Sequence, residues 1–241
     1  MKKQRLDKFI SNQFIMPRTH SKTAIRCGKV CVNGSVIKDP AYLFDAENSE
    51  VVYNGKVVSY KEHVYLMLNK PSGILSAATD KSKETVVDLV PRDFKRNGLF
   101  PVGRLDKDTT GHLIITDDGD FAHNCISPKK HVEKSYIVTL DGNINEEIVN
   151  IFNDGVVLAD GTKCKSAKLE PIENNTVRII ISEGKYHQIK RMFGTVSLGV
   201  NKLHRERIGE LVLPSDLKVG EFRELSVEEA KKALISTNVD M

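Results

Sequence analysis

Apolar positions near the start of the chain recur at helical spacing. Leu6, Phe9, Ile10 and Phe14 fall three or four residues apart, and the positions between them are mostly polar. This period places the four side chains on one face of a helix. The pattern predicts an amphipathic helix that ends before Pro17, because proline cannot continue a helix interior.

A second helix and two hairpins are predicted to follow. Ser21 is placed to cap a helix over residues 22–27, and Gly28 is placed to end it. The short apolar runs within 30–37 and 50–58 each surround an Asn-Gly pair. Asn-Gly is the strongest short hairpin signal, because both residues tolerate the left-handed conformation of a tight turn.

Short β-type runs separated by turns dominate the rest of the chain, with few helical patterns. These runs cover residues 64–68, 113–115, 135–140, 155–158, 167–169 and 177–181. A capping box that begins at Ser226 opens a final helix through Leu234. This order predicts an α+β fold, with a mainly antiparallel or mixed sheet and peripheral helices.

The polar residues 59–63 lack a clear period and mark a linker. We therefore expect a small domain over residues 1–58 and a larger one over 64–236. The two domains also differ in charge. Residues 1–38 contain nine Lys and Arg against the single acid Asp7, a net +8, so the remaining 203 residues carry −4 of the total +4. A basic block on a near-neutral body is typical of a module that binds a polyanion.

Composition limits the other classes of function. No apolar stretch approaches the ~20 residues of a membrane span, and no signal-peptide core follows the charged N-terminus, so we expect a cytoplasmic protein without membrane contact. The four cysteines are too scattered for a disulfide framework or a metal site, and they are expected to be reduced thiols. With neither a phosphate-binding loop nor a dinucleotide motif, we expect no cofactor and no metal.

Asp106 is the strongest catalytic candidate from local chemistry. It lies in a charged loop bracketed by Gly103 and Gly111, and a buried strand over 113–115 is expected to follow. Cations on either side, Arg104 and Lys107, favour an ionised carboxylate that is available as a nucleophile.

The string Gly-Arg-Leu-Asp-Lys-Asp-Thr-Thr-Gly at 103–111 resembles the nucleophile motif of RNA pseudouridine synthases. The Lys-Pro-Ser-Gly turn at 70–73 resembles the opening motif of the same catalytic domain. The resemblance implies that Asp106 is catalytic and that Arg104 and Leu105 contact substrate. It also implies a looped or extruded uridine, because a base within a duplex cannot reach such a site. His112 departs from the motif, because relatives usually carry an aliphatic residue there.

Two further segments resemble the active-site signature of this family. Tyr136, at the start of the strand over 135–140, matches a tyrosine that stacks on the target base. Lys190 matches the basic residue that forms an ion pair with the catalytic aspartate, and Arg191 is the competing assignment. The resemblance leaves His187 and Arg191 with a role in positioning or RNA contact.

The basic block resembles the alpha-L RNA-binding motif, from Arg5 to Asn33-Gly34. In that family the second helix and the hairpin after it contact RNA. The implied contacts are Arg18, Lys22, Arg26 and Lys29.

The segment 203–209 (Leu-His-Arg-Glu-Arg-Ile-Gly) resembles the branch of the family that modifies small-subunit ribosomal RNA. It implies conversion of one uridine of 16S rRNA, the equivalent of uridine 516, in a partly assembled small subunit. A monomer is the default expectation. Two alternatives stay open at this point. The chain could modify large-subunit rRNA, or it could be a non-catalytic RNA-binding factor of ribosome assembly.

Overall fold

The computed structural model describes residues 3–14 and 16–236 and divides them into two compact units. The first unit is 3–63 together with 92–98, and the second is 64–91 with 99–236. The expected linker 59–63 lies in the first unit. So does the segment 92–98, which the sequence analysis assigned to the larger domain. The Arg96 guanidinium explains this, because it donates hydrogen bonds to the carbonyl oxygens of Lys61 (3.0 Å) and Glu62 (3.1 Å).

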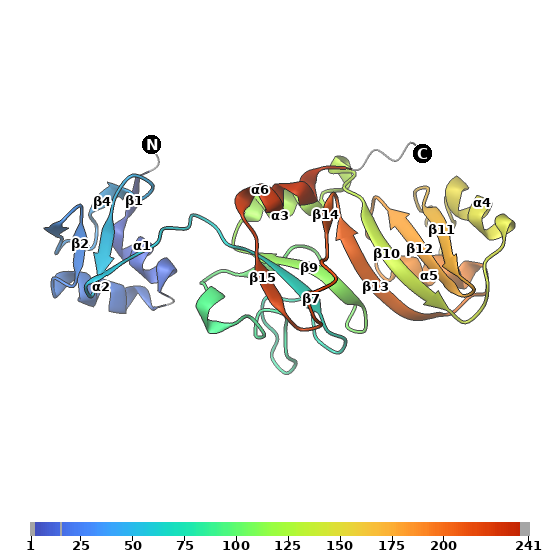
Figure 1. Cartoon of the computed structure of the whole chain (residues 1–241), viewed down its shortest axis with the longest axis horizontal. Helices are drawn as coiled ribbons and strands as arrows, with labels where there is room; N and C mark the ends of the chain where they lie inside the picture. The colour runs from blue at the N-terminus through green and yellow to red at the C-terminus, as the bar shows by residue number, and fades with distance from the viewer. Residues whose placement is uncertain (1–2, 15, 237–241) are drawn as a thin grey trace. The chain divides into compact units, whose positions relative to one another are not determined.

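The first unit combines two helices with short strands (Figure 1). Strands β3, β2, β5 and β6 form one sheet in that order, and β1 pairs with β4. The predicted apolar face of the first helix is confirmed for Leu6, Phe9 and Ile10, which are buried in the core of this unit. Phe14 was expected on the same face, but it is the C-cap residue after the helix and is exposed. The elements are β1 (Lys3–Arg5), α1 (Leu6–Gln13), α2 (Arg18–Arg26), β2 (Val30–Val32), β3 (Ser35–Val36), β4 (Leu43–Asp45), β5 (Val51–Tyr53) and β6 (Lys56–Val57).

Both predicted hairpins are present. Asn33 and Gly34 have φ angles of 49° and 77°, and Asn54 and Gly55 have the same pair of values. Two consecutive left-handed residues make the turn whose twist matches that of the flanking strands. The Asn-Gly pairs therefore set the register of β2 with β3 and of β5 with β6.

The start of the second helix differs from the prediction. The helix begins at Arg18, directly after Pro17, whose ring presets the backbone for a helix start. Ser21 does not cap the helix, because it lies inside it and is buried. Its hydroxyl donates to the carbonyl oxygens of Asp7 and Arg18, both at 2.9 Å, and so ties α2 to α1.

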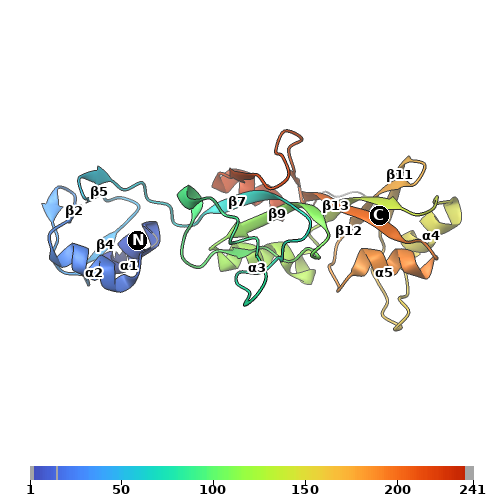
Figure 2. The ribbon, with the colours of Figure 1, turned by 90° about the horizontal axis from the view of Figure 1, so that it is seen from below.

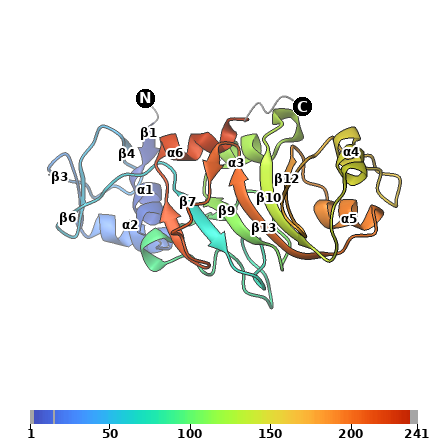
Figure 3. The same cartoon turned by 45° about the vertical axis from the view of Figure 1, so that its right-hand side comes forward.

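The second unit is built on one sheet in which β11, β12, β10, β13, β9, β7 and β15 lie in that order, with β14 on β13 and β8 on β9 (Figure 3). Its strands are β7 (Tyr65–Lys70), β8 (Phe100–Pro101), β9 (Thr110–Thr116), β10 (Lys134–Leu140), β11 (Lys168–Glu173), β12 (Thr176–Ile181), β13 (Val200–Ile208), β14 (Leu211–Val212) and β15 (Phe222–Glu224). Its α-helices are α3 (Gly119–Ile126), α4 (Glu146–Asp154), α5 (Gln188–Thr195) and α6 (Val227–Lys231). Short 3-10 turns occur at Arg92–Phe94 in the first unit and at Pro128–Lys130 and Lys232–Leu234 in the second.

The mixed character of this sheet is as predicted. The strand β13 runs parallel to β9 and antiparallel to β10, and the other pairings of the sheet are antiparallel. The prediction of a strand at 155–158 is wrong, because only an isolated bridge joins Val157 to Lys163 there. The central strand β13 was not predicted, and it is formed by the mostly polar segment 200–208.

Helices cover the sheet, with α3 and α5 on the same side of the strands (Figure 2). Phe121 of α3 and Ala230 of α6 pack in one core cluster with Tyr65, Met67 and Ile114 of the sheet. The predicted capping box of α6 is present, with reciprocal bonds between Ser226 and Glu229. No helix in the described part of the chain is long and apolar enough to cross a membrane.

Candidate active site

Asp106 lies in the loop between β8 and β9, at the middle of the large sheet. Gly111, at the end of this loop, has a φ of 100°, and a Cβ atom there would lie 2.3 Å from the Arg205 carbonyl oxygen on β13. Only glycine permits so close a backbone approach. The close contact brings the loop against the centre of the sheet, where β9 and β13 run parallel.

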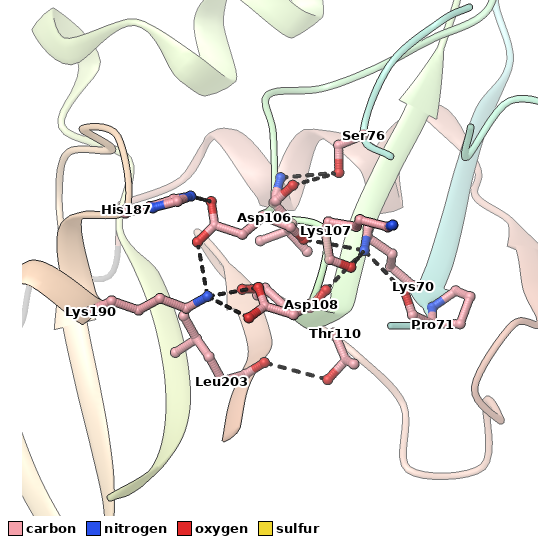
Figure 4. Close-up of polar contacts among 12 residues, drawn as sticks. Lys70, Pro71, Ser76, Asp106, Lys107, Asp108, Thr110, His187, Lys190 and Leu203 are labelled. Atoms are coloured by element: carbon pink, nitrogen blue, oxygen red, sulfur yellow. Dashed lines mark hydrogen bonds and ion pairs between the residues drawn. The ribbon is translucent and has the colours of Figure 1, made fainter. Parts of the chain in front are cut away.

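A buried lysine is hydrogen-bonded to the backbone of this loop (Figure 4). The fully buried Lys70 Nζ donates to the carbonyl oxygens of Pro71 (3.0 Å), Asp106 (3.3 Å), Lys107 (3.1 Å) and Thr109 (3.0 Å). Burial lowers the pKa of Lys70 to about 8, and the charges of Asp108 and Asp106 oppose this shift. Four carbonyl acceptors around one ammonium fix the path of the backbone that carries Asp106.

Ser76 fixes the other side of the loop. Its hydroxyl donates to the Leu105 carbonyl oxygen at 3.0 Å and accepts from the Leu105 amide at 3.1 Å. Leu105 is buried, and the neighbouring Arg104 side chain is exposed. Both residues line the same pocket as Asp106, which suits the substrate contacts that the sequence analysis assigned to them.

The Asp106 carboxylate lies between two groups of the 187–190 segment (Figure 4). His187 Nε2 is 3.5 Å from Oδ1, and Lys190 Nζ is 3.6 Å from Oδ2. His187 adopts a left-handed backbone, with a φ of 48°, at the N-cap of α5. The start of α5 therefore brings an imidazole and an ammonium to the carboxylate from one side.

Lys190 is shared between two carboxylates. Its Nζ lies 2.7 Å from both carboxylate oxygens of Asp108, closer than it lies to Asp106. The hydrogen bond from Lys190 holds the pKa of Asp108 below its ordinary value. The sequence analysis expected a pair with Asp106, whereas the structure shows a three-residue cluster.

The competing candidate Arg191 is directed elsewhere. Its guanidinium lies 2.5 Å from Asp160 Oδ2 and donates a longer bond, 3.4 Å, to the Tyr186 carbonyl oxygen. The Thr162 backbone and side chain, together with Arg191, lower the pKa of Asp160 to about 2. In the described structure Lys190, and not Arg191, is the basic residue placed at Asp106.

Tyr136, on β10, lines the same pocket. The pocket is lined by Asp106, Tyr136, His187 and Lys190, together with Arg104, Leu105, Thr109, Ile181, Gly184, Lys185, Gln188, Ile189 and Leu203. Behind Tyr136 lies the buried Arg205, whose guanidinium carbon is 5.9 Å from the ring centre and whose Nη1 is 3.5 Å from the hydroxyl oxygen. One pocket thus holds a carboxylate, cationic groups and an aromatic ring.

His112 is fully buried behind the loop. Burial and the nearby Arg205 charge lower its pKa to about 3, so the imidazole is neutral at physiological pH. Neither ring nitrogen has a hydrogen-bond partner among the residues described. His112 fills core space where an aliphatic residue was expected, and it does not line the pocket.

The basic residues expected to bind RNA lie on and after α2 of the first unit. Arg18, Lys22 and Arg26 are four residues apart and therefore form one row along the helix, with Lys29 two residues beyond its C-cap. Arg18 is tied to Asp7, because its Nη2 donates to both carboxylate oxygens at 3.0 Å. Hydrogen bonds from Arg5 and Arg18 lower the pKa of Asp7 to about 2. Part of the Arg18 charge is thus neutralised within the unit.

Two residues of the site had no assigned role from the sequence. Lys70 was quoted only as part of a turn motif, and nothing in the neighbouring sequence marks its side chain as buried. Asp108 was quoted only within the loop motif. Among the residues described, no cluster of His, Cys, Asp or Glu is arranged to hold a metal ion.

Comparisons with known proteins agree with this geometry. The RNA pseudouridylate synthase family model matches residues 64–195, and the S4 domain model matches residues 4–51. An uncharacterized RNA pseudouridine synthase of Bacillus subtilis is 42% identical over 93% of this chain and 96% of its own length. The ribosomal small subunit pseudouridine synthase A of Escherichia coli K12 is 40% identical over 93% of this chain and 97% of its own.

A solved structure has the same architecture. The crystal structure of a pseudouridylate synthase superimposes with a TM-score of 0.67 at 36% identity, over 95% of this chain and 99% of that one. The family model covers more than half of the residues, and the relatives cover nearly all of them. The chain therefore belongs to the RNA pseudouridine synthases that carry an N-terminal S4 domain, enzymes that convert uridine in RNA to pseudouridine.

Proposed function

We propose that this enzyme converts one uridine of 16S small-subunit rRNA, the equivalent of uridine 516, to pseudouridine. The substrate in this proposal is a partly assembled small subunit, and the enzyme acts on it as a monomer in the cytoplasm. Relatives from Escherichia coli K12 and Yersinia pestis, 40% and 41% identical, carry the name ribosomal small subunit pseudouridine synthase A. The segment 203–209, which resembles that branch, contributes Leu203 to the pocket wall.

One observation supports the catalytic assignment above the others. Asp106, Tyr136 and Lys190 are far apart in the sequence, lie on a loop, a strand and a helix, and still line one pocket. In the proposal, Asp106 is the catalytic carboxylate and Lys190 places a positive charge beside it, 3.6 Å from Oδ2. Tyr136 stacks on the uracil, and His187 and Arg104 contact the substrate around it.

The chemistry uses these groups without any change of oxidation state. The bond from C1′ of the ribose to N1 of uracil breaks, the base turns, and C1′ forms a bond to C5. C5 then releases its proton and N1 takes one up, so that product and substrate are isomers. Three first steps suit Asp106 at this position: attack on the sugar carbon, attack on the base, and removal of a ribose proton. Each of them needs an ionised carboxylate close to an enclosed, unstacked uridine.

The runner-up substrate is a uridine of large-subunit rRNA, since the pocket chemistry is the same for both. A purely RNA-binding assembly factor would not require a carboxylate, a tyrosine and an ammonium in one pocket. The relatives named after the small subunit favour the first substrate.

The test is to incubate the purified protein with protein-free 16S rRNA, with partly assembled small subunits and with large-subunit rRNA. Pseudouridine is then mapped by primer-extension stops after carbodiimide treatment. We expect one stop in 16S rRNA, strongest with the partly assembled subunit. A stop confined to large-subunit rRNA would replace this proposal with the runner-up, and no stop on any RNA would refute it.

A further inference from the structure

Tyr186 is the most exposed of the large apolar side chains that the structure describes, with 75% of its surface accessible. It lies in the turn before α5, between two residues of the pocket wall, Lys185 and His187. Tyrosine has a large apolar ring that is usually covered. A solvent-exposed aromatic ring beside a pocket for RNA is therefore a candidate for contact with a ligand.

The ring already has a partner on one face. Tyr186 and His187 are stacked, with ring centroids 3.8 Å apart and planes inclined by 19°. The imidazole of His187 in turn lies 3.5 Å from the Asp106 carboxylate. Tyr186 therefore stacks on a residue that itself contacts the catalytic carboxylate.

The turn that presents Tyr186 is held firmly. The Glu183 carboxylate accepts from the Lys165 amide at 3.0 Å and from Gln188 Nε2 at 2.8 Å, and Gln188 Oε1 accepts from the Lys185 amide at 2.8 Å. His187 holds a left-handed conformation that is strained for a residue with a side chain. These bonds order the backbone of the turn that carries the ring, which reduces the conformational entropy lost when a ligand binds there.

The substrate supplies a group that fits this surface. A uridine that enters the pocket leaves its stack, so the base next to it loses a stacking partner. Proteins that bind single-stranded RNA replace such lost stacking with aromatic side chains, which accept any base.

We propose that Tyr186 is a stacking platform for the nucleobase adjacent to the target uridine. This inference rests on the proposed function, because it assumes that a uridine of rRNA occupies the pocket. The ring supplies the binding, and the hydroxyl does not take part. The site therefore recognises a base next to the target rather than the target itself.

The protein side of the test compares three variants. We expect Tyr186→Ala to raise KM about 5- to 100-fold, the range that the loss of one base–aromatic stack corresponds to, with kcat changed less than about twofold. Tyr186→Phe keeps the ring and should resemble the wild type. Ile172→Ala removes an exposed apolar side chain of β11, outside the pocket, and is the matched control. A fall in kcat at constant KM would mean that Tyr186 positions His187, and it would overturn the proposal.

The RNA side uses 16S rRNA ligated so that one nucleotide beside the modified uridine lacks its base. Removing the stacked base should weaken binding to the wild type and have no further effect on Tyr186→Ala. The abasic nucleotide and Tyr186→Ala could instead weaken binding independently, so that their fold-changes multiply. That result at both neighbouring nucleotides would overturn the inference. Absence of pseudouridine with unaltered rRNA would instead refute the proposed function, so the two failures are distinguishable.

Discussion

The ammonium of Lys190 supplies positive charge to two carboxylates of the site. It lies 2.7 Å from both oxygens of Asp108 and 3.6 Å from Asp106. Without this ammonium, less positive charge would compensate the negative charges of Asp106 and Asp108, which lie two residues apart in one loop. The ammonium therefore lowers the pKa of Asp108 and places a positive charge beside Asp106.

The first prediction separates Lys190 from its neighbour. Lys190→Met should lower kcat about a hundredfold or more, because it removes the cation from the catalytic carboxylate, and RNA affinity should change only a few-fold. Arg191→Met should lower kcat less than about fivefold, since Arg191 pairs with the half-exposed Asp160. Single-turnover kinetics on the unmodified rRNA substrate measure the rate loss of both variants. A larger loss from Arg191→Met would reverse the assignment.

At the scale of elements, the loop over 105–109 depends on strand β7. Lys70 ends this strand and donates to three carbonyl oxygens of the loop and to that of the adjacent Pro71. A buried ammonium is costly to desolvate, and these acceptors offset that cost. The cation is therefore the structural support of the catalytic loop.

The second prediction removes this support. Lys70→Met should lower the free energy of unfolding by about 3 kcal/mol or more, because it leaves buried carbonyl oxygens without a donor. It should also lower kcat, since the Asp106 backbone is released. Thermal unfolding and turnover are measured side by side with Lys107→Met, a neighbouring lysine that is exposed. Equal stability of the two variants would contradict the role given to Lys70.

Elements with strong local chemistry were predictable from the sequence. The Asn-Gly hairpins, the amphipathic face of α1 and the capping box of α6 each rest on residues within one short window. By contrast, β13 was not predicted, because its side chains are mostly polar. Its strand geometry comes from pairing with β10 and β9, which are distant in sequence.

The same distinction holds for the site. Asp106, Tyr136 and Lys190 were recognised from motifs, but the sharing of Lys190 with Asp108 depends on a contact across 82 residues. The support from Lys70 spans 36 to 39 residues for its loop carbonyls. Contacts of this kind arise from the fold and carry no local signal in the sequence.

At the scale of the whole molecule, the first unit carries the basic residues expected to bind RNA, and the second unit carries the candidate active site. Lys22, Arg26 and Lys29 lie on or after α2, and Arg26 and Lys29 are exposed. Deleting the first unit is a poor test of its role. The segment 92–98 belongs to that unit, and its Asn97 donates to the Ser11 carbonyl oxygen at 3.4 Å.

The third prediction therefore neutralises charge and keeps the fold. Changing Lys22, Arg26 and Lys29 together to Gln should weaken RNA binding and reduce the slope of log affinity against log salt by about 2, near 0.7 for each lost phosphate contact. The turnover of bound RNA should stay near the wild-type rate. The control variant changes three exposed lysines outside the pocket, Lys129, Lys130 and Lys231. An unchanged slope would show that this row of cations does not hold RNA.

The most direct test of the account is the release of tritium from C5-labelled uridine in rRNA by Asp106→Asn. The change is nearly isosteric and removes only the charge. We predict at least about a 10³-fold loss of turnover, with RNA affinity within a few-fold of the wild type. Asp108→Asn, the same exchange two residues away, should retain far more activity. Tritium release by Asp106→Asn at a rate near that of the wild type would contradict the central claim that Asp106 is the catalytic carboxylate.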